Sequence, residues 1–172
     1  MKVKNNALIF AIIIVIALKV AYTQADLRDL LFILYPTELI VATFSGSISV
    51  YLPDGGYFHP EENMIIQKSC SGFNFLIINF ITYYTTCNLH FKSATKKWLS
   101  IPICLFGSYI LTVVVNASRI LIAISLAKTN FFKGNLAHEI QGTFVYLFFI
   151  LGAYILLKNH LNKTKNENIA SA

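Results

Sequence analysis

The chain has 172 residues, of which 56% are hydrophobic and only 13% are charged, and its formal net charge is +6. Soluble domains carry about 25% charged residues, and the apolar residues here stand in long blocks, so the composition excludes an ordinary soluble domain and indicates a polytopic membrane protein. The excess of lysine is typical of the positive-inside rule and not of nucleic-acid binding, because no basic groove with interleaved aromatic residues is present.

The N-terminal part is expected to enter the membrane once and then to follow its surface. The apolar segment 7–22 follows a basic start, and Lys19 interrupts it where a cleaved signal peptide would be smooth, so we expect a retained membrane helix. Segment 27–44 is also apolar, but a charge at mid-bilayer costs about 2.5–3.5 kcal/mol. It contains residues that suit a membrane centre poorly, namely Arg28, Asp29, Pro36 and Glu38. We therefore expect an interfacial or re-entrant segment at 27–44.

Residues 45–69 are the polar part of the chain. The stretch SISVY alternates in the manner of a strand, and MIIQK further on is a second candidate strand. Between them, PDGG at 53–56 is strong turn chemistry. The pattern predicts a short extracytoplasmic β-hairpin or loop that leads into Cys70.

Three further apolar blocks follow, at 72–91, 99–127 and 139–157. Each is long enough to cover a hydrocarbon core of ~30 Å at ~1.5 Å per residue. The predicted fold is an all-α polytopic membrane protein with four to six transmembrane helices. We expect one integral membrane catalytic domain over residues 1–160 and a cytoplasmic tail over 161–172.

Charge bias places three reactive side chains at one face of the membrane. We assign the N-terminus and the lysine clusters that begin at Lys92 and Lys158 to the cytoplasm, as the positive-inside rule requires. Cys70 then lies at the outer end of its helix. Arg119 lies about one membrane thickness beyond the first cluster, and His138 about one thickness before the second. The convergence requires that 27–44 does not span the membrane.

Cys70 is a candidate nucleophile. The attacking species is the thiolate, which the free N–H groups and dipole of a helix N-terminus favour, and Lys68 would add to this effect. Ser71 and Gly72 would allow a backbone or a substrate to approach closely. The alternative is a small buried apolar side chain.

The other two cysteines, Cys87 and Cys104, lie in the middle of predicted helices, where the buried interpretation is favoured. Three cysteines without close spacing also argue against a disulfide framework or a cysteine-rich zinc site.

Arg119 is flanked by apolar residues on both sides, in VVVNASRILIAIS. A buried intramembrane arginine usually has an anionic partner or a functional role, and its fixed donors suit a thiolate or the oxyanion of a tetrahedral intermediate. Asn116 lies three residues earlier on the same helical face, where it would orient Arg119 or donate to the oxyanion. The alternative is an alkyl stem that snorkels to the headgroups.

His138 opens the last apolar helix in LAHEIQG. A helix N-terminus disfavours imidazolium, so the ring would accept the thiol proton and later protonate the leaving amine. The alternative is an interfacial histidine bonded to headgroups, and Glu139 would orient His138 or cap the helix. Gly142 stands where a zinc-protease H-E-x-x-H helix needs its second histidine, so we expect no metal there. His59 with Glu61 and Glu62 is only a weak metal-binding pattern.

Taken together, these residues resemble the exosortase/archaeosortase family of multi-spanning cysteine transpeptidases, and most closely the exosortase K subgroup. The resemblance rests on SCSG at 69–72, NASRI at 116–120 and HEIQG at 138–142, in the family's order, and covers roughly residues 35–157. It implies a thiol protease or transpeptidase without a cofactor, with Cys70 as nucleophile, Arg119 as anion stabiliser and His138 as acid/base. One departure is that typical family members carry more spans than this chain can hold.

The resemblance also implies a partner and a location. The partners would be secreted proteins with a C-terminal sorting signal, which consists of a short motif, a transmembrane helix and a basic tail, together with the lipid bilayer and no nucleic acid. The location would be a bacterial cytoplasmic (inner) membrane, with both termini in the cytoplasm and the site on the extracytoplasmic face. Two alternatives stay open. One is a non-catalytic transporter or assembly subunit in which Arg119 pairs with a partner's acid; the other is a metalloenzyme that uses His59, Glu61 and His138.

Overall fold

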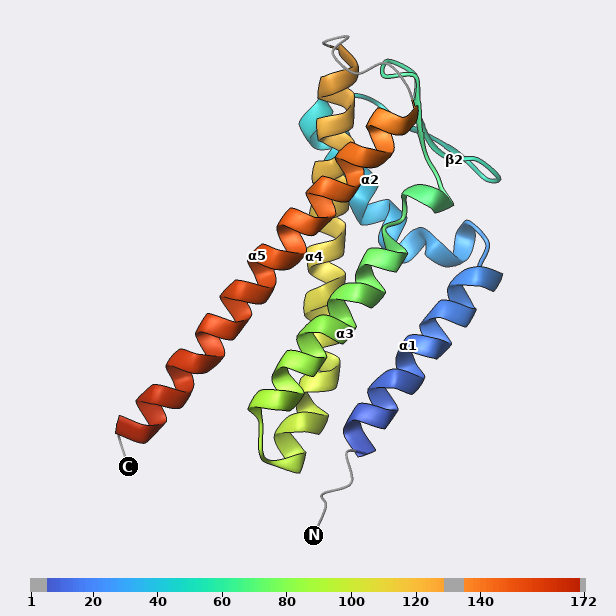
Figure 1. Ribbon diagram of the computed structural model, residues 1–172. Helices are drawn as coiled ribbons and strands as arrows, with labels where there is room; N and C mark the ends of the chain where they lie inside the picture. Colours follow the sequence, from blue (N-terminus) through green and yellow to red (C-terminus); the bar gives the residue numbers. More distant parts are fainter. Residues whose placement is uncertain (1–5, 129–134, 171–172) are drawn as a thin grey trace.

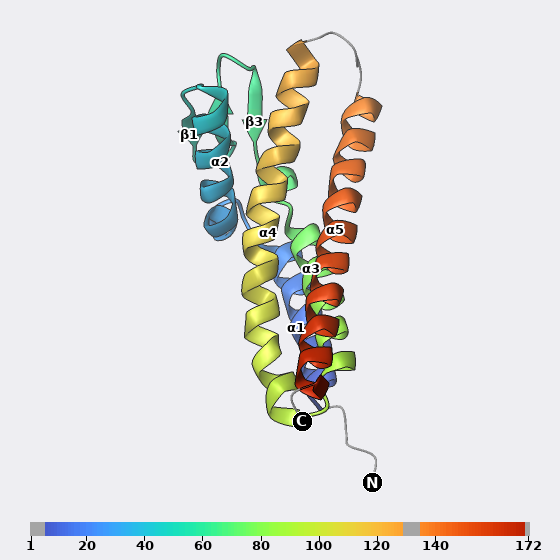
Figure 2. The same cartoon turned by 90° about the vertical axis from the view of Figure 1, so that its left-hand side faces the viewer.

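The long apolar segments of the chain fold as helices that run side by side, and a small sheet lies at one end of them (Figures 1 and 2). The computed structural model describes residues 6–128 and 135–170, with side chains described for 6–127 and 142–164. The long helices are α1 (Asn6–Gln24), α3 (Phe73–His90), α4 (Ala94–Lys128) and α5 (Asn135–Ala170).

The two ends of this bundle differ in what they carry (Figure 1). The start of α1, the connection between α3 and α4 with the first turn of α4, and the last turns of α5 lie at one end. We call it the basic end because Lys92, Lys97 and Lys158 belong to these segments. Helix α2 (Leu31–Ser45) and the sheet lie at the opposite end, which we call the sheet end. The chain thus places its lysine clusters at one end, as the charge pattern predicted.

Three of the described helices are long and apolar enough to cross a membrane: Asn6–Gln24, Ala94–Ala127 and Gly142–Thr164. They expose large apolar side chains, among them Phe144 and Phe148 of α5 at 69% and 74%. An apolar surface of this kind suits lipid and is unusual against water. The chain is mostly helical with a small sheet, and its three candidate spans are compatible with the predicted membrane protein.

Helix α3 matches the predicted block 72–91 in its bounds but not in its apolar character. It is not among the three described helices that qualify as spans, so the described residues hold fewer candidate spans than the predicted four to six. The asparagine, threonine and tyrosine side chains of α3 lower its hydropathy. Asn79 and Asn88 are buried. Helix α3 packs against α1, α4 and α5 and turns these polar groups toward its neighbours.

Two apolar clusters hold the bundle together. The first joins α2, β3, α3 and the sheet-end half of α4, and includes Leu34, Ile66 and Ile120. The second joins α1, α3, the basic-end half of α4 and α5, and includes Phe80 and Leu161. Burial of such side chains is the main favourable term in folding, at about 25 cal/mol per Å² of apolar surface removed from water.

Segment 27–44 folds as a one-turn 3₁₀ helix, η1 (Arg28–Leu30), followed by α2. Pro36 lies inside α2 and cannot donate to the carbonyl of Phe32, four residues earlier. The hydroxyl of Tyr109, on α4, donates to that carbonyl instead at 2.7 Å. Helix α2 is shorter than a membrane span and lies beside the sheet, while its interfacial position stays a prediction.

The polar region 45–69 forms a three-stranded antiparallel sheet in the order β1 (Val50–Leu52), β2 (Gly56–His59), β3 (Met64–Ile66). The predicted turn at PDGG is present between β1 and β2, but GYFH adds a central strand that the predicted hairpin lacked. Gly56 is required there, because its φ is +103° and an added Cβ would lie 2.2 Å from the carbonyl oxygen of Ile66. Strand β3 leads directly into the segment that contains Cys70.

The last helix is longer than its predicted apolar block. Helix α5 extends over Asn135–Ala170, beyond the block at 139–157 in both directions. Residues 161–170, which were predicted as the start of a tail, continue this helix.

Candidate functional site

Cys70 lies in a tight turn between the sheet and α3. It closes the 3₁₀ helix η2 (Lys68–Cys70), and its N–H donates to the carbonyl of Gln67 at 2.8 Å. The Ser69 hydroxyl is 3.9 Å from the Cys70 sulfur. Cys70 is partly exposed, whereas Cys87 and Cys104 are buried. The predicted burial of Cys87 and Cys104 is therefore confirmed, and Cys70 differs from both.

Gly72 ends the turn and begins α3 with a φ of +69°. An added Cβ would lie 3.2 Å from Cγ of Asn116 and 3.2 Å from Cγ2 of Thr112. Both the backbone conformation and the lack of space therefore favour glycine. The close approach that was predicted at Gly72 is made by the side chains of α4.

Ser71 is fully buried between Cys70 and Gly72. Its hydroxyl oxygen accepts a hydrogen bond from the N–H of Phe73 at 3.3 Å, so it satisfies one of the free donors at the start of α3. Ser71 therefore shapes the turn from inside.

Asn116 connects α4 to the Cys70 turn. The side chain is fully buried, and its amide Nδ2 donates to the backbone carbonyl of Cys70, 46 positions earlier. Its Oδ1 accepts a hydrogen bond from the hydroxyl of Tyr146 at 2.8 Å. Asn116 was predicted to orient Arg119 or to donate to an oxyanion; the structure engages its amide with the carbonyl of the cysteine itself.

Arg119 lies one turn further along α4, with its side chain against α5. A Cβ added to Gly142 would lie 3.1 Å from both Cδ and Nη1 of Arg119, so the arginine passes directly over the glycine backbone. Its guanidinium carbon is 5.2 Å from the ring centroid of Tyr146, which is within cation–π distance. Arg119 thus occupies the contact between α4 and α5.

His138 and Glu139 lie near the start of α5, about one turn before Gly142. Their side chains fall outside the part of the chain whose side chains are described, so the predicted acid/base role of His138 stays a prediction. The HEIQG segment nevertheless reaches the site through Gly142. NASRI therefore contacts both other motif segments: SCSG through Asn116, and HEIQG through Arg119.

Tyr146 was not predicted as a site residue. Its hydroxyl bonds to Asn116, and its ring stacks on Phe75 of α3 with centroids 4.4 Å apart and an interplanar angle of 16°. An aromatic residue in an apolar helix carries no signal of such a role, because aromatic residues are common in these helices. The only available clue was its spacing of one helical turn from Gly142.

Lys68 turns toward α1. Its ammonium donates to the carbonyl of Ala25 at 2.5 Å and lies 5.3 Å from the ring centroid of Tyr22. The Tyr22 hydroxyl is in turn 3.5 Å from the Lys68 carbonyl. These contacts attach the Cys70 turn to the end of α1, and the predicted effect of Lys68 on the thiolate stays a prediction.

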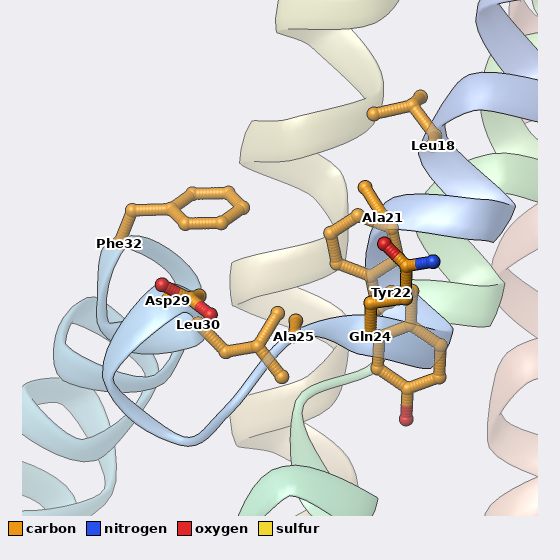
Figure 3. Close-up of a pocket in the computed structure, with 9 residues that line it drawn as sticks. Leu18, Ala21, Tyr22, Gln24, Ala25, Asp29, Leu30 and Phe32 are labelled. Carbon is orange, nitrogen blue, oxygen red and sulfur yellow. The ribbon is translucent and has the colours of Figure 1, made fainter.

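A cavity of about 360 Å³ lies beside this turn, between the end of α1, η1 and the starts of α2 and α3 (Figure 3). Phe32, Tyr22 and Phe73 contribute aromatic rings to its wall, and Asp29 and Gln24 contribute polar groups. Tyr22 and Phe73 stack with centroids 5.0 Å apart. Its lining suits an apolar or aromatic group, and Phe73 connects it to the turn that carries Cys70.

His59 is placed away from this site. It is fully buried in β2, and its Nδ1 is 2.8 Å from the hydroxyl oxygen of Ser47. Burial lowers the pKa of His59, and the nearby carboxylates of Glu38 and Glu62 oppose that shift. Among the side chains of 6–127 and 142–164, no three His, Cys, Asp or Glu residues are grouped as a metal site. The buried environment of His59 is that of a core histidine bonded to a serine.

Comparisons of the chain with protein-family models, with curated proteins and with solved structures gave no match. Its function is therefore argued from its own residues. The arrangement offers a partly exposed thiol at a helix start, an arginine held over α5, and a buried amide that links these elements.

Proposed function

We propose that this protein is an integral membrane thiol protease or transpeptidase of the exosortase type, which cleaves C-terminal sorting signals of secreted proteins. The observation that supports this proposal is the meeting of SCSG, NASRI and HEIQG, which are far apart in the sequence. Asn116 bonds to the carbonyl of Cys70, and Arg119 lies against Gly142. These two contacts join the Cys70 turn, the Arg119 segment of α4 and the Gly142 segment of α5, as a shared catalytic site requires.

In the proposed reaction the Cys70 thiolate attacks the scissile carbonyl of the sorting signal. The new C–S bond forms a tetrahedral intermediate, and Arg119 stabilises its oxyanion. The C–N bond then breaks, His138 gives the leaving amine the proton that it took from the thiol, and an acyl-enzyme remains on Cys70. An amine or water then attacks the acyl-enzyme and forms a new C–N or C–O bond while the C–S bond breaks. The attacking group gives its proton to His138, which returns it to Cys70 and restores the thiol.

The proposed orientation places the basic end in the cytoplasm and the sheet end outside a bacterial cytoplasmic membrane. Lysines at the basic end support this orientation through the positive-inside rule. In this arrangement α3 crosses the membrane as a fourth span, because its polar side chains face the other helices and lipid meets few of them. The substrate would meet Cys70 at the outer surface, where its sorting helix leaves the bilayer.

The proposal is tested with a secreted reporter that carries a C-terminal motif, a transmembrane helix and a basic tail, expressed together with the protein. We expect cleavage by the wild type and none by Cys70→Ala. Cys104→Ala is the matched control, because it removes a buried thiol from the same chain. Cleavage is measured as release of the tail on a gel and by mass spectrometry of the new C-terminus.

Cleavage that persists in Cys70→Ala would contradict the proposal. If the wild type has a cellular function that Arg119→Ala abolishes and Cys70→Ala preserves, the protein is instead a non-catalytic membrane module in which Arg119 pairs with a partner. Sensitivity of that function to a chelator would point to the metalloenzyme alternative.

A further inference from the structure

Tyr146 is a residue of α5 that contacts both α3 and α4. It lies one helical turn after Gly142, so it shares the face of α5 that Arg119 contacts. Its hydroxyl and its ring make different contacts. The hydroxyl bonds to Asn116, while the ring contacts both Phe75 of α3 and the guanidinium of Arg119.

The hydroxyl of Tyr146 fixes the orientation of the Asn116 amide. The carbonyl of Cys70 can only accept a hydrogen bond, so the Asn116 nitrogen must face it and the Asn116 oxygen must face away. The Tyr146 hydroxyl donates to that oxygen at 2.8 Å. Asn116 itself is fully buried, so its amide has little access to competing water. The hydrogen-bonded chain runs from Tyr146 through Asn116 to the backbone of Cys70.

The ring of Tyr146 acts on a second group. Its stacking on Phe75, with centroids 4.4 Å apart, holds it against the first turn of α3. The guanidinium carbon of Arg119 lies 5.2 Å from its centroid. A ring held from one side by α3 therefore offers a fixed aromatic surface to the arginine of α4.

We propose that Tyr146 is a positioning residue of the thiol site: its hydroxyl holds Asn116 in the orientation that fixes the Cys70 turn, and its ring holds Arg119. The effect of Tyr146 on catalysis rests on the proposed function. The hydrogen-bonded chain from Tyr146 to Cys70 can be tested without that function. Tyr146 acts through its neighbours and takes no part in the bonds that form and break.

The first test measures the turn itself. Hydrogen exchange at the amides of Cys70 and Ser71, which close η2, is compared in Tyr146→Phe and wild type in lipid nanodiscs. We expect exchange about fivefold to tenfold faster in Tyr146→Phe, the effect of losing one partly buried hydrogen bond. Tyr154→Phe, the same substitution further along α5 where the ring contacts Lys158, should leave exchange unchanged. Unchanged exchange in Tyr146→Phe would overturn the proposal whatever reaction the protein performs.

The second test asks whether the hydroxyl acts through Asn116. In the reporter assay, Tyr146→Phe should lower kcat about fivefold to tenfold with KM unchanged, because substrate contacts are kept and the thiol is misplaced. The same substitution in an Asn116→Ala background should add less than about twofold, since coupled residues are not additive. An additive loss in the double variant, or a loss confined to KM, would overturn the role.

Folding is controlled by size-exclusion chromatography and circular dichroism of each variant. If Asn116→Ala does not fold, the exchange comparison of Tyr146→Phe with Tyr154→Phe still decides the proposal. Failure of the proposed function has a separate signature, which is cleavage that survives Cys70→Ala. Tyr146→Leu completes the series: it removes the ring as well, and should lower kcat at least about twofold further than Tyr146→Phe.

Discussion

The two ends of the α3–α4 pair both carry cysteine, and the two environments differ in almost every respect. Toward the basic end, the sulfur atoms of Cys87 and Cys104 face each other at 3.8 Å inside an apolar cluster with Phe80 and Leu161. Toward the sheet end, Cys70 is partly exposed in a turn that bonds to a buried asparagine.

The comparison shows that residue type alone does not decide what a thiol does. Cys87 on α3 and Cys104 on α4 are buried between helices, so a reagent reaches them only when the bundle opens. Cys70 lies where the backbone leaves a strand, turns at a glycine and enters a helix, and in this position the residue stays partly exposed. The same helix thus carries a structural thiol in its interior and a candidate nucleophile just before its first turn.

The largest expected effect is in thiol labelling. In intact cells or spheroplasts, a charged, membrane-impermeant maleimide should react with Cys70 at least about a hundredfold faster than with Cys87 or Cys104, because the buried thiols react only through opening of the bundle. Single-cysteine variants and mass spectrometry identify the labelled site. Equal labelling of Cys104 would remove the contrast between the two ends, and labelling of Cys70 only from the cytoplasmic side would reverse the proposed orientation.

The next effect separates the two described glycines within the apolar span of α5. Gly142→Ala places a methyl group 3.1 Å from Cδ and Nη1 of Arg119, so the arginine must move, whereas Gly152→Ala meets nothing within 4 Å. We expect reporter cleavage to fall about tenfold to a hundredfold in Gly142→Ala, because small displacements of a catalytic group are costly. Gly152→Ala should cleave at the wild-type rate. Equal activity of the two variants would show that displacing Arg119 does not affect the reaction.

A smaller effect is expected on stability, at two glycines that share one backbone conformation. Gly72 and Gly46 have φ of +69° and +72°, so alanine strains both turns alike. An added Cβ at Gly72 also meets Asn116 and Thr112 at 3.2 Å, whereas at Gly46 it meets nothing within 4 Å. Gly72→Ala should therefore be destabilised by about 1–3 kcal/mol more than Gly46→Ala, as is typical of overpacking. Thermal unfolding in detergent measures the difference. Equal unfolding midpoints of the two variants would show that α4 moves to accommodate the added methyl group.

The smallest effect concerns the pH dependence of the sheet end. Because burial lowers the pKa of His59, the folded state favours the neutral ring, and the unfolded state binds the proton first as the pH falls. The stability that the neutral ring supplies is present above about pH 6.5 and is lost as the pH falls toward the lowered value. Proteolysis of the loops around the sheet should therefore speed up below about pH 6.5 in the wild type.

His59→Asn provides the control for this prediction, since its amide can still bond to Ser47 and does not titrate. Its proteolysis rate should change less between about pH 7 and about pH 5. A wild-type rate that is flat over this range would show that Glu38 and Glu62 fully offset the effect of burial.

The sequence by itself determined the long elements of this protein. Blocks at 7–22 and 72–91 appear as helices within about two residues of their predicted ends, because a helix pairs the backbone N–H and C=O groups within the segment itself. The turn at PDGG and the burial of Cys87 and Cys104 also followed from local chemistry. Charge clusters predicted which ends of the helices lie together.

Only the tertiary structure decided the contacts that assemble the site. Nothing in the apolar run around Tyr146 marks it as the partner of Asn116, 30 positions away, because a hydrogen bond across helices depends on their rotation and offset. For the same reason, the structure alone shows that Lys68 turns to Ala25 and that His59 is enclosed with Ser47. Apolar blocks indicate which segments become helices, whereas packing determines which helix faces meet. The Cys70 turn is held by such contacts, with the end of α1 and with α4.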